Sequence, residues 1–316
     1  MRVGVCFDID GVLLRGSKVL PGARESLKRL VHQNIPFLFI TNGGGHLESH
    51  RAKILSEKMQ LEIHSGQIIL SHTPMRTLAD VFSRKRVMIL GCRNEMEVAR
   101  QYGFERTVSP QQFCAQHPDL YPFRNVALVG CDLYKDEEIE GILVMHDPVD
   151  WHLELQVCVD ILLGRDPLRN QTHQGSQVVP IYNSNEDFVF AGAYEHPRFA
   201  QGAFLETLQH LFKRTTAGKE LQVGRFGKPH KVTFDHAAHL LAKNSNSAVF
   251  DTIFMIGDNL DADIKGTRLC GKPWQSILVK SGIYKEGGEA DLADTICENV
   301  GEAVNYIIAN KLDKKA

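Results

Sequence analysis

Residues 3–13, VGVCFDIDGVL, form the stretch that decides the fold. An apolar run rich in β-branched and aromatic residues reaches Asp8, continues to Asp10 and turns at Gly11. Such a continuous apolar run predicts a strand buried on both faces, as in a parallel sheet. Carboxylates lose hydration when they are buried without partners, so two of them at a strand end suit a crevice that holds a cation. Taken alone, the pair fits an ordinary turn or helix cap better.

Three more polar clusters follow or end apolar runs. The run at 36–40 leads into TNGGG at 41–45, FGKP at 226–229 opens a helical pattern, and the run at 252–256 leads into GDNLDAD. Ligands of open α/β sheets bind outside the carboxyl ends of the strands. The sequence therefore predicts that three strand ends bring their polar side chains to one place. These side chains are Asp8, Asp10, Thr41 and Asp258.

In this order, the four clusters resemble the DxD, Thr/Ser, Lys and GDxxxxD motifs of the haloacid dehalogenase-like hydrolases. The resemblance implies an α/β fold with a doubly wound, parallel-sheet, Rossmann-like core. It also implies that the long insert between Thr41 and Lys228 is a class IIA cap, as in p-nitrophenylphosphatase-like proteins. The expected domains are a core at 1–83 and 199–316 and an α/β cap at 84–198.

Further motifs along nearly the whole chain resemble one eukaryotic branch, haloacid dehalogenase-like hydrolase domain-containing 5. The motifs are FDIDGVLLRG, FITNGGG, SHTP at 71–74, HDPVDW at 146–151, VPIYNSNED at 179–187, FAQGAF at 199–204, GKPHKVTFDHAAHLL from Gly227 and VKSGIY at 279–284. Members of that branch are associated with mitochondria, and this resemblance suggests the same compartment here.

Alternating apolar and amphipathic segments support the division into core and cap. In the core we expect a helix after Pro21, a strand at 36–40 and a last helix at 300–310. In the cap we expect strands at 86–90, 126–129, 142–145 and 178–182, and helices at 94–102 and 151–163.

The composition of the chain argues against several classes of function. With 316 residues, 43% of them hydrophobic, the chain is long enough for two domains, and its net charge of −2 gives no reason to expect binding to nucleic acid. No run approaches the length of a membrane span, so we expect no membrane insertion. The seven cysteines contain no CxxC pair, which indicates reduced thiols in an intracellular protein rather than disulfides or a zinc site. Because the first strand begins at Val3, we expect no leader and a cytoplasmic location from the sequence itself.

The family resemblance also implies a set of roles. Asp8 would be the nucleophile that forms an aspartyl phosphate, and Asp10 the general acid and base. Mg²⁺ would bind to the Asp8 and Asp258 carboxylates and the Asp10 carbonyl, with Asp263 as a ligand through water or as a partner of Lys228.

Phosphate recognition is assigned by the same resemblance. The Thr41 hydroxyl, the main-chain N–H groups of Asn42 and Gly43, and the Lys228 ammonium would contact the transferring phosphoryl group. The expected substrate is a small phosphorylated metabolite, because a cap excludes large ones.

Several alternatives stay open at this stage. A phosphomutase would use the same residues, and a scaffold protein would keep the fold without turnover. Polar and aromatic residues of the cap are candidates for leaving-group recognition, although packing or solvation explains each of them better. These candidates are Asp150, Trp151, Arg165, Arg169, Asn183 and Asn185. Strand edges of the cap suggest a homodimer formed through it.

Overall fold

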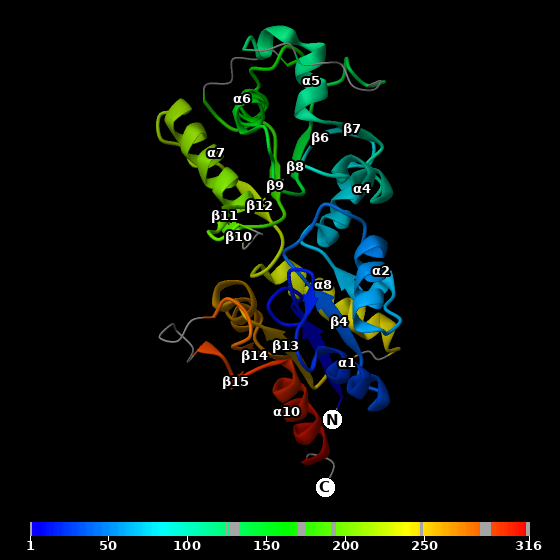
Figure 1. The fold of residues 1–316 in the computed structure, drawn as a ribbon. Coiled ribbons are helices and arrows are strands. Elements are labelled where there is room, and N and C mark those ends of the chain that lie inside the picture. Colours follow the sequence, from blue (N-terminus) through cyan, green and yellow to red (C-terminus); the bar gives the residue numbers. More distant parts are fainter. Residues whose placement is uncertain are drawn as a thin grey trace. The chain divides into compact units, whose positions relative to one another are not determined.

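In a computed structural model of the chain, residues 2–123, 126, 133–169, 175–190, 194–246, 249–284 and 292–313 are described. The chain forms two compact units. The core unit consists of Met1–Asn42, Leu47–Pro74 and Gly227–Ala316. The insert unit consists of Gly43–His46 and Met75–Phe226. Each unit is built on its own parallel sheet (Figure 1).

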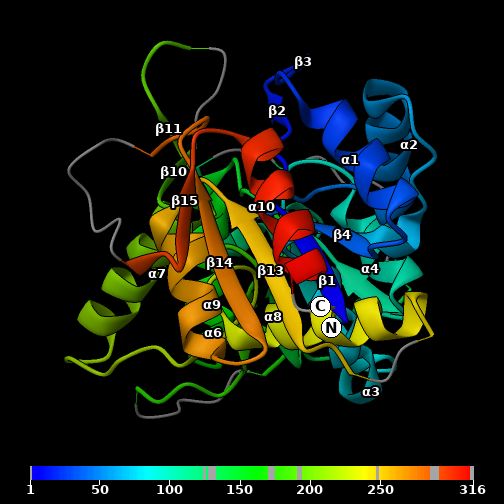
Figure 2. The ribbon, with the colours of Figure 1, turned by 90° about the horizontal axis from the view of Figure 1, so that it is seen from below.

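The core unit contains a six-stranded sheet in the order β15-β14-β13-β1-β4-β5, and every neighbouring pair is parallel. Figure 2 shows β15, β14, β13, β1 and β4 following one another across this sheet. The strands are β1 (Val3–Phe7), β4 (Phe37–Ile40), β5 (Ile68–Ile69), β13 (Thr252–Gly257), β14 (Trp274–Val279) and β15 (Thr295–Cys297). All residues of β1 and β4 are buried, as expected for strands covered on both faces.

Helices cover both faces of the core sheet. One face packs its β-branched and aromatic side chains against the apolar sides of α1, α2 and α10, and the other packs against α8. The helical segments are α1 (Ala23–His32), α2 (Glu48–Met59), η1 (Ser65–Gln67), α8 (Lys231–Asn244), η4 (Leu260–Ile264), α9 (Lys265–Cys270) and α10 (Val300–Asp313). A short hairpin, β2 (Leu14–Arg15) and β3 (Lys18–Val19), follows the end of β1.

The insert unit contains a five-stranded sheet in the order β12-β9-β8-β6-β7, again with parallel pairs throughout. Its strands are β6 (Arg86–Leu90), β7 (Arg106–Val108), β8 (Gly141–Val144), β9 (Ile181–Asn183) and β12 (Val223–Arg225). Its helices are α3 (Ala79–Phe82), α4 (Glu95–Gln101), α5 (Pro110–Gln116), η3 (Pro118–Leu120), α6 (Trp151–Leu162) and α7 (Gln201–Thr215). The segment η2 (Thr73–Leu78) joins the units, and β10 (Val189–Phe190) pairs with β11 (Arg198–Phe199) in an antiparallel hairpin.

The boundaries of the units differ from the expected domain limits of 83/84 and 198/199. Met75 and the residues after it already belong to the insert unit, and the chain returns to the core unit at Gly227. The reason for the second difference is that α7 packs on the insert core and β12 pairs with β9. Most of the strand expected at 126–129 lies outside the described residues.

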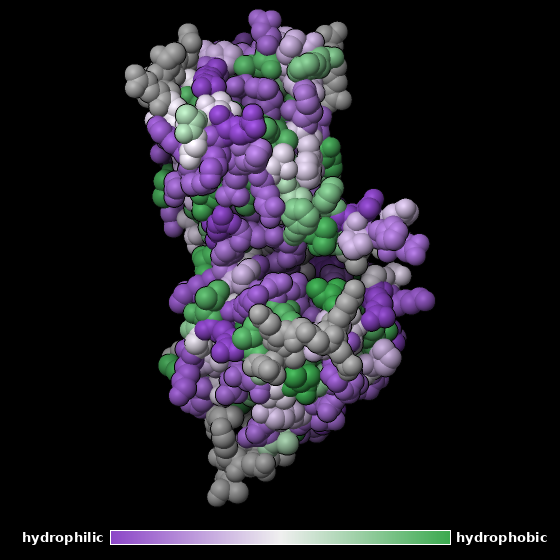
Figure 3. Space-filling view, turned by 90° about the vertical axis from the view of Figure 1, so that its left-hand side faces the viewer, coloured by the Kyte–Doolittle hydropathy of each residue, from purple (hydrophilic) through white to green (hydrophobic). Residues whose placement is uncertain are grey.

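Apolar surface is limited on the face shown in Figure 3, which is mostly hydrophilic with scattered hydrophobic residues. Isolated apolar side chains are normal on a protein surface. None of the helices within the described ranges has both the length and the apolar character that crossing a bilayer requires.

Candidate active site

The core sheet reverses its strand order between β1 and β13. The chain adds β4 and β5 on one side of β1, and β14 and β15 on the far side of β13. Such a switch point is where open α/β sheets bind ligands, beyond the carboxyl ends of the strands. Asp8 directly follows β1, and Asp258 directly follows β13. Both predicted acids therefore lie at the switch point.

Lys228 links two of the predicted acids. Its Nζ lies 2.5 Å from Oδ1 of Asp8 and 2.6 Å from Oδ1 of Asp263. The lysine is 3% exposed and Asp263 is fully buried. Charged groups are buried at this depth only when they are paired, so these residues act as one unit. The predicted Lys and acid motifs thus lie together in the structure, while their catalytic and metal-binding roles stay a prediction.

Asn42 fixes the main chain that carries this lysine. Its Oδ1 accepts the Lys228 main-chain N–H at 2.9 Å, and its Nδ2 donates to the Lys228 carbonyl at 3.0 Å. This two-way amide pairing locks the loop before α8 against the end of β4. The motif resemblance implies a role only for the main-chain N–H of Asn42, and no local sequence pattern indicates this use of its side chain.

The backbone at two glycines lies close to the Asp258 carboxylate. The Ile283 main-chain N–H donates to its Oδ2 at 2.8 Å, and a Cβ added at Gly11 or Gly282 would overlap this same oxygen. Gly11 has a φ of 95°, a conformation that also favours glycine. A Cβ at Gly257 would overlap the carboxyl group of Asp263. Close approach of the backbone to these carboxylates thus explains why glycine occupies all three positions.

The electrostatics of the cluster are dominated by burial and crowding of negative charge. Burial raises the pKa of Asp8 well above its usual range; Lys228 opposes this rise, while Asp263 and Asp258 add to it. Burial, followed by repulsion from Asp263, raises the pKa of Asp258 to about 6. Burial lowers the pKa of Lys228, but Asp263 and Asp8 outweigh it, so its pKa lies above its usual value. Three carboxylates thus share one ammonium group, which leaves room for another cation.

The remaining core residues predicted for the site are Asp10, Thr41 and Gly43. The Asp10 side chain is 58% exposed, and Oδ2 pairs with Nη2 of Arg51 on α2 at 3.1 Å. Thr41 is buried at the end of β4, and its N–H donates to the Ile69 carbonyl. Gly43 begins the Gly43–His46 segment of the insert unit. Sequence reasoning gave no signal for Arg51, because it lies in an ordinary amphipathic helix.

The predicted leaving-group residues make contacts inside the insert unit. Trp151 donates its Nε1–H to the Pro148 carbonyl and packs on Phe204, at the start of α6. Arg165 is exposed after the other end of α6, and Arg169 pairs with Glu138.

Asn183 and Asn185 lie together in a buried network. Asn183 donates to the carbonyl of Asn185 at 2.7 Å and accepts from Nε2 of Gln201 at 2.8 Å. Asn185 in turn accepts the N–H of Asp187. Contact of these side chains with a substrate stays a prediction.

Comparison with known proteins places this site in a family. Residues 5–105 match the model of the haloacid dehalogenase-like hydrolases, and residues 225–303 match a second model of haloacid dehalogenase hydrolase-like proteins. A mitochondrial hydrolase of Saccharomyces cerevisiae is 32% identical over 320 residues, covering 91% of this chain and 90% of the relative. The chain therefore belongs to the haloacid dehalogenase-like hydrolase family and is a hydrolase.

Two more proteins show how far the likeness extends. Human glycerol-3-phosphate phosphatase is 24% identical over 295 residues, covering 92% of this chain and 83% of that protein. The p-nitrophenyl phosphatase structure from Archaeoglobus fulgidus aligns with a TM-score of 0.67 at 17% identity, over 96% of this chain and 98% of that one. The structural match confirms the predicted fold class of a parallel α/β core with an α/β insert. The narrower eukaryotic branch stays a prediction.

Proposed function

We propose that this hydrolase is a Mg²⁺-dependent phosphatase that removes a phosphoryl group from a small phosphorylated metabolite through an aspartyl phosphate on Asp8. The observation that carries this proposal is the buried contact of Lys228 with Asp8 and Asp263 at the switch point beside Asp258. The names of two relatives support the reaction class: one is a glycerol-3-phosphate phosphatase and the other a p-nitrophenyl phosphatase.

The residues at the switch point fit a magnesium ion. Their donors are carboxylate and carbonyl oxygens, which Mg²⁺ prefers over nitrogen and sulfur. Asp8, Asp258 and the Asp10 carbonyl would hold the ion, with Asp263 binding through water or serving Lys228. Bound Mg²⁺ would offset negative charge on the phosphate oxygens. The glycines beside Asp258 support this assignment, because close backbone approach at Gly11 and Gly282 restricts where the Asp258 carboxylate can lie.

The chain's own residues then divide the reaction between them. The Asp8 carboxylate attacks phosphorus while the ester oxygen leaves and takes a proton from Asp10. Asp10, now ionised, removes a proton from the water that attacks the aspartyl phosphate, which frees Asp8 and inorganic phosphate. Lys228 balances the charge of Asp8 and the phosphoryl oxygens, while Thr41, Asn42 and Gly43 donate hydrogen bonds to those oxygens.

The test is hydrolysis of p-nitrophenyl phosphate by the full chain with and without Mg²⁺. We expect activity that requires the metal and falls by roughly a thousandfold or more in Asp8→Asn, because the nucleophile is lost. The matched control is Asp261→Asn, because Asp261 is exposed and pairs with Lys265, four residues further along the chain. Full activity in Asp8→Asn would exclude the covalent mechanism, and inactivity of the wild type over a broad panel of phosphate esters would exclude the phosphatase.

We further propose a mitochondrial location and a homodimer formed through the insert unit. The name of the yeast relative supports the first proposal. For the second, β7 and β12 each have one strand neighbour among the described residues, so both present an edge. Cell fractionation and sedimentation equilibrium test these proposals, and a purely cytosolic monomer would contradict both.

A further inference from the structure

The insert sheet has its own switch point, between β6 and β8. From β6 the chain adds β7 on one side, and from β8 it adds β9 and β12 on the other. Ligands bind outside the carboxyl ends of strands at such a point. Cys92 and Glu95 lie just after β6, and His146 and Asp147 lie just after β8. Side chains capable of binding a metal are therefore gathered where topology favours a ligand site.

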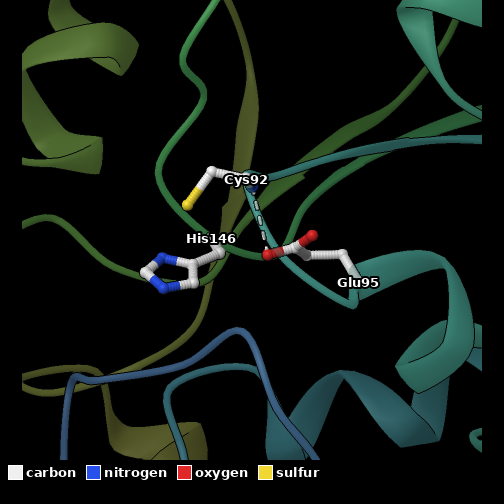
Figure 4. A group of neighbouring side chains, drawn as sticks. All are labelled: Cys92, Glu95 and His146. Carbon is white, nitrogen blue, oxygen red and sulfur yellow. Dashed lines mark hydrogen bonds between the residues drawn. The ribbon is translucent and has the colours of Figure 1, made fainter.

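The first three of these side chains converge. Cys92 Sγ, a carboxylate oxygen of Glu95 and a ring nitrogen of His146 all lie within 4.8 Å of one another. Figure 4 shows the Cys92 thiol and the His146 ring on the same side of the group, with Glu95 hydrogen bonded to the Cys92 main chain. Thiolate, carboxylate and imidazole together are a donor set typical of zinc.

Neighbouring contacts hold the three donors in place. The Glu95 carboxylate is buried and accepts the main-chain N–H groups of Cys92 and Arg93. The backbone at Gly45 lies so close to the His146 ring that an added Cβ would overlap it. A site of this kind is partly organised before a metal binds, which lowers the entropic cost of binding.

Asp147 adds a second, independent sign of a missing cation. Its Oδ2 lies 3.0 Å from Nδ1 of His146, and its main-chain N–H lies 2.7 Å from the same nitrogen. Its other oxygen, Oδ1, is buried without a hydrogen-bond partner. A buried carboxylate oxygen without a partner is costly, and a nearby divalent cation would offset that cost. Nη1 of Arg93 lies 3.2 Å from Nε2 of His46.

We propose that the insert unit binds Zn²⁺ through Cys92, Glu95 and His146, with the Asp147 carboxylate beside His146 supporting the ion. Three protein ligands leave a fourth position for water or a ligand atom, as in zinc sites that are open to solvent. The donor set of this site differs from that of the proposed phosphatase centre, whose donors are all oxygen. The absence of a CxxC pair argued against zinc in the sequence, but here the ligands come from two strand ends far apart in the chain.

Cobalt is the probe that separates the two centres. Added to the metal-free full chain, Co²⁺ bound by a thiolate gives a near-ultraviolet charge-transfer band, whereas Co²⁺ on carboxylates alone does not. We expect one equivalent of Co²⁺ to produce the band and Zn²⁺ to abolish it. Cys92→Ser and His146→Ala should remove the band, while Cys270→Ser and Asp258→Asn should keep it. Absence of the band in the wild type, or its survival in Cys92→Ser, would overturn the proposal.

A second measurement needs no variant and so does not depend on folding of a mutant. Cys92 is the exposed cysteine among those described, so it is the one most open to alkylation. We expect Zn²⁺ to slow alkylation of Cys92, measured by peptide mass spectrometry, and Mg²⁺ to leave it unchanged. Equal rates with and without Zn²⁺ would refute the site whatever the phosphatase assay shows.

Discussion

Asp8 and Asp258 end the neighbouring strands β1 and β13 of one sheet, while Cys92 and His146 follow the neighbouring strands β6 and β8 of another. Both pairs lie at the point where the strand order reverses. In the core unit the donors are carboxylates paired with a buried lysine, and in the insert unit they are sulfur, nitrogen and oxygen. The topology therefore supports the place of each proposed site, and the donor chemistry supports the ion that we propose for it.

A polar residue at a strand end is not sufficient evidence for a site. Asn183 ends β9 of the insert sheet, yet its amide is satisfied by Gln201 and by the Asn185 carbonyl. Asp8 and Asp258, by contrast, are buried acids whose pKa is raised by burial and by neighbouring carboxylates, and Lys228 opposes this rise only in part. The useful distinction is between satisfied polar networks, which stabilise a fold, and unbalanced charge, which attracts ligands.

Among the substitutions that test the distinction between satisfied networks and unbalanced charge, Lys228→Met should have the largest effect on stability. The substitution leaves Asp8 and Asp263 buried without their ammonium partner. We expect a loss of about 3–5 kcal/mol of unfolding free energy near neutral pH in the presence of a chelator, together with loss of phosphatase activity. Urea denaturation followed by circular dichroism measures the change.

Lys231→Met is the matched control, because Lys231 pairs with Asp235 in an exposed i,i+4 contact. Its stability should be close to that of the wild type. If both variants lost equal stability, the buried cluster would not differ energetically from a surface pair, and the contrast between the regions would fail.

A smaller effect is expected for Gly282→Ala. The new Cβ would overlap Asp258 Oδ2 and push this carboxylate from its position. Misplacement of a catalytic group by about 1 Å can cost about 100-fold in rate, so we expect a loss of that order in kcat/KM with Mg²⁺. Gly66→Ala is the control, because Gly66 is exposed and its added Cβ would meet only the Asn244 Oδ1 at 3.9 Å. Wild-type kinetics in Gly282→Ala would remove Asp258 from the proposed metal site.

Much of the core centre was predictable because its residues lie in short, contiguous patterns. Asp8 and Asp258 each follow a short, continuous apolar run, and such a run predicts a strand buried on both faces. The motif resemblance implied that Lys228 and Asp8 share one site and that Asp263 pairs with Lys228 or binds the metal through water, and the structure brings the three side chains together. The catalytic roles that the resemblance implies stay a prediction. The side-chain pairing of Asn42 with Lys228 did not follow, because it joins residues that no local pattern connects.

The return from insert to core was predicted too early for a similar reason. The amphipathic helix α7 has an apolar face that would suit either sheet, and β12 is only three residues long. Its membership in the insert sheet is decided by pairing with β9, which is a long-range contact. The convergence of Cys92, Glu95 and His146 also depends on such contacts, so composition alone argued against it.

The smallest effect on stability is expected for a substitution of Glu154 in the insert unit. Glu154 lies on α6, and its side chain is buried, with 1% of the residue exposed. It accepts the Asp150 main-chain N–H at 2.8 Å and the Gln111 Nε2–H at 3.3 Å. Burial raises its pKa to about 7, against the partial opposition of these hydrogen bonds. No cation is paired with it among the contacts described, so it should behave as a titrating structural group rather than as a ligand.

The coupling between proton binding and folding gives the direction in which Glu154 changes stability with pH. A pKa raised in the folded state means that folding favours the protonated acid, so this contribution is complete below the unfolded pKa of about 4.3 and is lost as the pH rises through 7. Glu154→Gln keeps one carbonyl for Asp150 and carries no charge. We therefore expect the free energy of unfolding of the variant to exceed that of the wild type by about 1–3 kcal/mol at pH 8, and to equal it at pH 4.

Urea denaturation between pH 4 and pH 8 isolates the contribution of Glu154, because Asp8 and Asp258 titrate in both proteins. Glu206→Gln, an exposed change on α7, should show no pH-dependent difference. A constant difference between Glu154→Gln and wild type at every pH would mean that folding leaves the pKa of Glu154 unchanged. A buried carboxylate that ionises as it does in the unfolded chain would require a cation beside it, which would make Glu154 a second candidate ligand of the insert unit.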